Sequence, residues 1–313
     1  MRMAENGASH FDLAVLGADD PLGESVLRLL EEREIAVGNL YPLTLNDSDT
    51  TVVFAGQDWP CLPAEHFDFS QTQALLVTSK SAAAEQLVAR VVAAHTALPV
   101  ARVAETAARE PAAAVVVARL LAVVDAVAGI RSAEAMLALP VADAGKAGVD
   151  ELSEQTRGLF NLDSPDAEVF PAQIAFNLMP LPDADYDARL VEATCRLLGK
   201  SIDLGFSGLL APLFYGAAVV LHVRTERTPD PDKLRQACRH AEGLLLMESD
   251  LPIGIPTPAT DAADSDDVFI GRIRAIGNRL QFWLVFDPMR LEAARIVDVV
   301  ENWIDKPTNS MLT

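Results

Sequence analysis

The chain has 313 residues, half of them apolar, which argues against general disorder and allows for two folded domains. Asp and Glu total 45 against 25 Lys and Arg, and the formal net charge of −20 disfavours nucleic acid and anionic membrane surfaces as partners. The chain contains three widely spaced cysteines without a CxxC pair: Cys61, Cys195 and Cys238. This cysteine usage, and the lack of an apolar core in residues 1–10, predict a cytoplasmic protein without a signal peptide.

The first hundred residues alternate between short apolar runs and amphipathic runs. We expect strands at 11–17, 51–55, 74–78 and 100–103, and helices from Gly23 to Arg33 and over 82–95. Alternation of strand and helix predicts a parallel sheet with crossover helices.

The pattern changes after about residue 110. We expect helices at 112–128, 147–161, 185–198 and 289–304, strands at 134–143, 202–210 and 214–226, and a hairpin of 267–276 with 279–286 around Gly277-Asn278. In the helix 147–161, Asp150, Glu151, Glu154 and Arg157 form the charged face. The strands predict an antiparallel α+β layer with helices on one side. The polar stretch 257–267 predicts a mobile loop whose aspartates are solvated.

The turn after the first strand, Gly17 to Gly23, resembles a dinucleotide-binding turn only at its ends. Such turns are glycine-rich because the pyrophosphate must approach backbone N–H groups at a helix N-terminus. Here Asp19 and Asp20 place two carboxylates where attraction for phosphate is needed. A structural role, with Asp20 as helix N-cap and Pro21 as the first helical residue, is therefore favoured over cofactor binding.

The remaining motifs favour structural roles. Leu198–Ser201 (LGKS) lacks the earlier glycine of a P-loop, so Gly199 is interpreted as a helix C-cap. The five histidines show no metal-ligand spacing, and we expect no metal site. Cys238 and His240 lie two residues apart in a predicted helix and do not face each other. On residues alone, the chain is a two-domain α/β protein without a visible catalytic constellation.

Five ordered segments resemble the aspartate-semialdehyde dehydrogenase family, and most of all its Usg-like branch. They are GADDPLG (17–23), AGKAGVDELSEQTRGLFN (144–161), QIAFNLMPLPD (173–183), VEATCRLLGKSIDLGFSGLLAPLFYG (191–216) and FWLVFDPMRLEAARIVDVV (282–300). The resemblance covers nearly the whole chain. It implies a Rossmann-like domain over 1–110 completed by the C-terminal helix 288–313, and an α+β dimerisation domain with a mostly antiparallel or mixed sheet over 111–287.

The family reduces an acyl phosphate with NADPH through a cysteine nucleophile, aided by a glutamine, a histidine acid/base, a carboxylate-binding arginine and a phosphate-binding loop. Carried over to this chain, the positions of the four side chains are occupied by Ala114, Val141, Leu210 and Ala217. The phosphate loop reduces to Ala104–Arg109, and Arg290 matches a basic family position. Only Gly17 and Gly23 remain of the cofactor turn.

The resemblance therefore implies the fold without the chemistry. The first hypothesis is a non-catalytic, homodimeric binding or interaction protein that uses no cofactor and could have a further protein partner. The helix 112–128 and the alternating strands would form its core and interface. The alternative is an NADP-dependent semialdehyde dehydrogenase with relocated catalytic residues, and a third is a small-molecule sensor without turnover.

Overall fold

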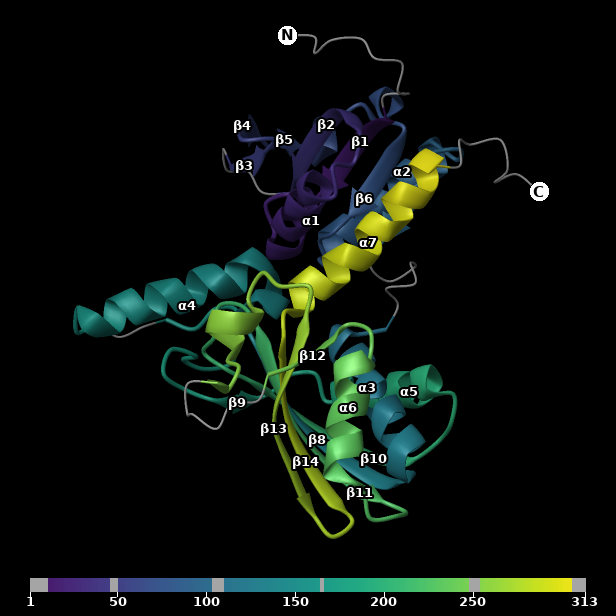
Figure 1. Cartoon of the computed structure of the whole chain (residues 1–313). Helices are drawn as coiled ribbons and strands as arrows, with labels where there is room; N and C mark the ends of the chain where they lie inside the picture. Colours follow the sequence, from purple (N-terminus) through teal and green to yellow (C-terminus); the bar gives the residue numbers. More distant parts are fainter. Residues whose placement is uncertain (1–10, 46–49, 103–109, 164–165, 248–253, 306–313) are drawn as a thin grey trace. The chain divides into compact units, whose positions relative to one another are not determined.

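The computed structural model describes residues 11–45, 50–102, 110–163, 166–247 and 254–305 (Figure 1). The chain divides into two compact units, one of residues 1–109 with 292–313 and the other of residues 110–291. The predicted phosphate-loop remnant, Ala104–Arg109, lies outside the described residues.

The first unit is built on a five-stranded sheet of order β5-β2-β1-β6-β7, in which each neighbouring pair is parallel. Its strands are β1 (Phe11–Leu16), β2 (Val37–Thr44), β5 (Leu62–Pro63), β6 (Ala74–Val77) and β7 (Val100–Arg102). Its helices are α1 (Pro21–Glu32), α2 (Ala82–Ala94) and the later part of α7 (Pro288–Asp305). Leu16, Leu43 and Val77 pack with Leu87 and Val88 of α2 in one buried cluster. The predicted parallel α/β arrangement is confirmed.

Two strands of this unit differ from the expectation. β2 was not predicted, and it lies between β5 and β1 in the sheet. The predicted strand at 51–55 does not join the parallel sheet. As β3 (Thr51–Phe54) it forms a separate antiparallel hairpin with β4 (Gln57–Pro60). Ala55 and Gly56 between them both have positive φ, 52° and 68°, which is the backbone of a two-residue hairpin turn.

The second unit is built on a seven-stranded mixed sheet of order β12-β13-β14-β11-β8-β10-β9. Its strands are β8 (Ile130–Leu139), β9 (Met179–Pro180), β10 (Asp203–Leu210), β11 (Ala217–Thr225), β12 (Leu244–Leu246), β13 (Val268–Ile276) and β14 (Arg279–Phe286). Its helices are α3 (Ala112–Ala128), α4 (Gly145–Phe160), α5 (Tyr186–Leu198) and α6 (Pro231–His240). The pairs β8–β10 and β12–β13 are parallel and the others are antiparallel, so the sheet is mixed.

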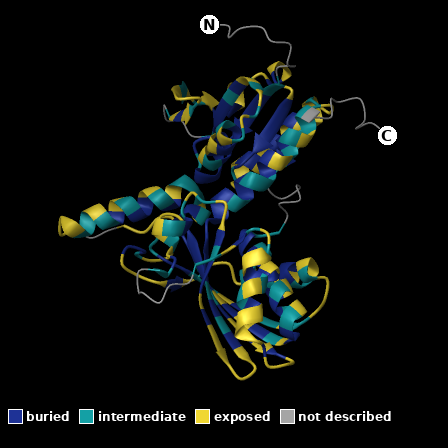
Figure 2. Ribbon diagram, in the orientation of Figure 1, coloured by how far each residue is buried: buried dark blue, intermediate teal, exposed yellow. Residues whose placement is uncertain are grey.

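One face of this sheet carries the main core. Helices α3, α5 and α6 cover it (Figure 1), and the buried residues gather between them and the strands (Figure 2). The predicted apolar helix, α3, supplies a large part of this core. Gly199 has φ +71° and ends α5, and Gly277 and Asn278 connect β13 to β14, both as predicted.

Two boundaries and one loop differ from the sequence prediction. β8 begins at Ile130 directly after Gly129 and stops before Pro140, so Val141 lies in a 3₁₀ turn and not in the strand. The stretch predicted as a polar loop contains a π-helical turn, Pro258–Ala262. Its aspartates are not merely solvated: Asp264 and Asp266 both form ion pairs with Arg290.

Candidate functional site

The four positions taken from the family resemblance come together at one edge of the seven-stranded sheet. A single residue, Gly129, joins α3 to β8, so α3 folds back over the sheet and its first turn, with Ala114, lies near the carboxyl end of β8. Val141 follows that end, and Leu210 is paired with Leu139 at the end of parallel β10. Ala217 begins antiparallel β11 at the same edge.

Every side chain at these positions is buried and apolar. Their exposed fractions lie between 0 and 4%: Ala114, Val141, Leu210 and Ala217. Ala114 and Ala217 belong to the main core cluster, and Val141 and Leu210 belong to a second cluster with Leu152 of α4. The Val141 backbone N–H donates to the Leu213 carbonyl at 2.9 Å. These four positions therefore offer neither a nucleophile nor a proton-transfer group, and their side chains contribute to the apolar core.

All three thiols, those of Cys61, Cys195 and Cys238, are at least partly covered by the protein. Cys238 is fully buried in the main core cluster. Cys61 lies in the first unit, and burial raises the pKa of its thiol, which keeps it in the weakly nucleophilic protonated form. His222 lies on β11 with an exposed side chain. The Nδ1 atom of His240 lies 2.7 Å from the Gln236 carbonyl oxygen of its own helix.

Arg290, the basic residue retained from the family pattern, is buried and neutralised. Its Nε donates to Asp266 Oδ1 at 2.6 Å, and its guanidinium lies 3.6 Å from Asp264 Oδ1. Asp287 precedes it and caps α7: Oδ1 accepts from the N–H groups of Met289 and Arg290, and Oδ2 accepts from that of Asp264. Burial raises the pKa of Asp287. Because both carboxylate oxygens accept backbone bonds, this group holds the 254–267 segment to α7.

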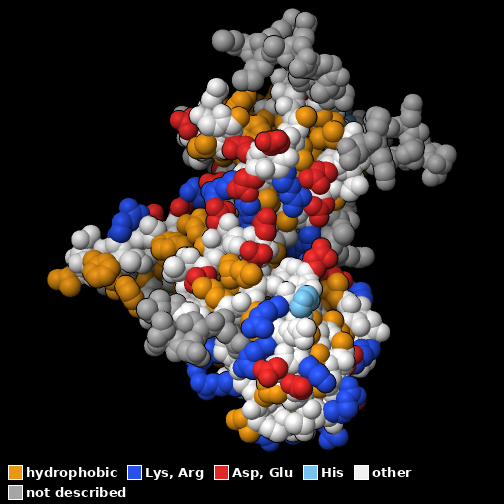
Figure 3. Space-filling model, viewed as in Figure 1, with side chains coloured by type: hydrophobic (Ala, Val, Ile, Leu, Met, Phe, Trp, Pro, Cys, Tyr) orange, Lys and Arg blue, Asp and Glu red, His pale blue; other side chains and the backbone are white. Residues whose placement is uncertain are grey.

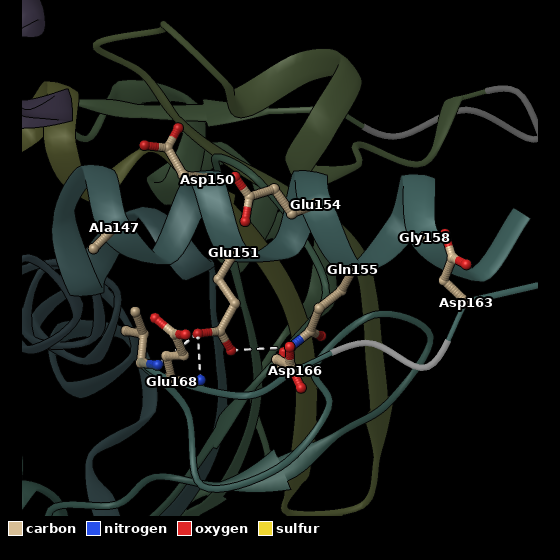
Figure 4. A pocket seen from close by; sticks show the side chains of 10 residues that line it. Ala147, Asp150, Glu151, Glu154, Gln155, Gly158, Asp163, Asp166 and Glu168 are labelled. Carbon is tan, nitrogen blue, oxygen red and sulfur yellow. Dashed lines mark hydrogen bonds between the residues drawn. The ribbon is translucent and has the colours of Figure 1, made fainter. Parts of the chain in front are cut away.

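Sequence reasoning missed a buried polar network under α4. Glu151, predicted on the charged face, is buried together with Gln155. Gln155 Nε2 donates to Glu151 Oε1 at 2.9 Å and to the Asp166 carbonyl at 2.8 Å (Figure 4). Its Oε1 accepts from the N–H groups of Ile174 and Ala175. The i, i+4 spacing of a carboxylate and an amide was a signal for a pair, but not for its burial.

The same network continues to the returning chain. Glu151 Oε2 accepts the backbone N–H groups of Glu168 and Val169, at 2.9 and 2.5 Å. A cavity of about 430 Å³ lies beside it, and its lining is largely acidic: Asp150, Glu151, Glu154, Asp163, Asp166 and Glu168. Within the described parts of the chain, no three His, Cys, Asp or Glu side chains are placed to hold a metal ion. The network thus fixes the segment after α4 onto the helix.

The glycine turn of the first unit is shaped by packing. A Cβ at Gly23 would lie 2.1 Å from the Gly17 carbonyl oxygen, and Gly17 itself has φ +84°, so both glycines are required for the turn. Asp20 occupies the N-cap position of α1 with Pro21 after it, as predicted, but its side chain makes no cap hydrogen bond. Asp19 is buried and accepts from Thr44 Oγ1 at 2.8 Å.

This turn does not fit a dinucleotide phosphate. The N-terminus of α1, where a phosphate would be attracted, already carries Asp19, Asp20 and, in its first turn, Glu24. A phosphate would meet carboxylates there, one of them buried and held by a threonine hydroxyl.

In the part of the chain that the structure describes, no helix is long and apolar enough to cross a membrane.

Comparison with known proteins assigns the family. Residues 120–291 match the model of the semialdehyde dehydrogenase dimerisation domain. The chain is 30% identical to the USG-1 protein homolog of Azotobacter vinelandii over 319 residues, covering 90% of this chain and 94% of that protein. The chain belongs to the aspartate-semialdehyde dehydrogenase family.

Other family members extend over the same length. The aspartate-semialdehyde dehydrogenase of Legionella pneumophila is 27% identical, covering 91% of this chain and 93% of its own. The crystal structure of aspartate semialdehyde dehydrogenase II from Vibrio cholerae complexed with ASA superposes with a TM-score of 0.79 at 24% identity, covering 96% of this chain and 99% of that one. The predicted resemblance and fold class, a Rossmann-like sheet and a second domain with a mixed sheet, are confirmed for this member of the family.

Proposed function

We propose that this member of the aspartate-semialdehyde dehydrogenase family is non-catalytic and acts in the cytoplasm as a homodimeric binding or interaction protein. One observation carries the proposal. The sheet edge where the family resemblance places the four reacting groups is filled by Ala114, Val141, Leu210 and Ala217, all buried. Loss of the nucleophile alone lowers the rate of a serine protease by about 10⁶-fold, and here the other three groups are replaced as well.

The charges near this edge support the same conclusion. Arg290 forms ion pairs with two aspartates, and these neutralise the charge that a substrate phosphate would need. In the first unit, Asp19 and Asp20 oppose the binding of a dinucleotide phosphate. We therefore propose that residues 1–110 and 288–313 form a nucleotide-binding-like domain without a resident NADP.

The homodimer is supported by the family model itself. The matched model is described as a dimerisation domain, and it spans 120–291, which is most of the second unit. In this proposal residues 111–287 are the dimerisation domain, and association between copies is the property that remains where catalysis is lost.

The test is an assay of the purified full chain with aspartate semialdehyde, inorganic phosphate and NADP⁺, followed at the absorbance of NADPH. An active family enzyme serves as the positive control. We expect no turnover above background and no micromolar NADPH binding by fluorescence titration. Turnover would overturn the proposal in favour of an enzyme with relocated residues, and micromolar NADPH binding would overturn the cofactor-free part. A monomeric mass in solution would overturn the homodimer.

A further inference from the structure

We draw no further inference here: the strongest candidate, the acidic cavity beside α4, carries none because its buried carboxylate, Glu151, already accepts the backbone N–H groups of Glu168 and Val169, and nothing else among the described residues points to a ligand there.

Discussion

Two regions of the second unit are apolar for opposite reasons. At the sheet edge, Ala114, Val141, Leu210 and Ala217 are sealed inside, where the family resemblance places polar groups. On α4 and the segment that returns along it, residues 145–163 and 166–178, which we call the arm, four large apolar side chains face outward: Phe160, Leu162, Phe176 and Leu178. A buried carboxylate and a buried amide lie beneath them in the same segment. Figure 3 shows hydrophobic atoms gathered at the outer end of α4. Buried apolar side chains stabilise the fold, whereas exposed apolar side chains gain that stabilisation only when another surface covers them. The first set of side chains therefore contributes to the core, and the second leaves an apolar surface exposed.

A charged side chain introduced among the buried residues at this end of the sheet should cause the largest loss of stability. Leu210→Arg restores the type of residue that the family resemblance places there, but puts an unpaired guanidinium into a buried apolar cluster. We expect a loss of about 3–5 kcal/mol in the free energy of unfolding, and no gain of activity. Denaturant unfolding measures the loss, and Leu197→Arg, at a half-exposed position, should stay within about 0.5 kcal/mol of wild type.

The hydrogen bonds that hold the arm together can be removed without changing its exposed side chains. Gln155→Ala leaves the N–H groups of Ile174 and Ala175 without their acceptor. Each buried group left unsatisfied costs about 1–3 kcal/mol, so hydrogen exchange over residues 166–175 should become faster. Thr156→Val, one position along the helix and half-buried, is the control. Unchanged exchange in Gln155→Ala would contradict the role assigned to the network.

A cysteine at position 114, where the family resemblance places the nucleophile, should not restore catalysis. In Ala114→Cys the sulfur enters a fully buried site, where burial raises a thiol pKa. We expect about 1–3 kcal/mol of destabilisation from overpacking and no turnover of aspartate semialdehyde. Measurable NADPH formation by this variant would show that the edge still accepts substrate.

One carboxyl group beside the sealed edge should make stability depend on pH. Asp287 follows Phe286, which pairs with Ala217, and burial raises its pKa in the folded state. Since the fold binds this proton more tightly than the unfolded chain does, the group destabilises the fold above its folded pKa and this penalty disappears as the pH falls through it. Relative to Asp287→Asn, wild type should gain stability from neutral to acidic pH. A difference constant over that range would contradict the assignment.

The smallest effect is expected from Phe160→Ser on the isolated fold. Because this side chain is largely exposed, its loss should change the unfolding free energy by less than about 0.5 kcal/mol at concentrations where the chain is monomeric. Denaturant unfolding measures the difference, and a loss above about 1 kcal/mol would mean that the ring contributes to the fold.

Local features of the fold were readable in the sequence. Gly199 ends a helix and Gly277-Asn278 forms the turn of a hairpin, each because few residues fit that backbone. The lack of a cysteine between Cys61 and Cys195 excluded a thiol nucleophile near position 114, whatever the alignment. These conclusions need only neighbouring residues or a residue count.

The tertiary structure decided what depends on distant partners. β2 was missed because its Gly38, Asn39 and Pro42 disfavour a strand, but β5 pairs only with Leu43 and Thr44, so at Pro42 the strand is an edge that tolerates a proline. Glu151 appeared to be a surface charge until residues 168 and 169 brought it two backbone donors. Burial of a polar group is fixed by which backbone returns to satisfy it, and periodicity within one helix does not contain that information.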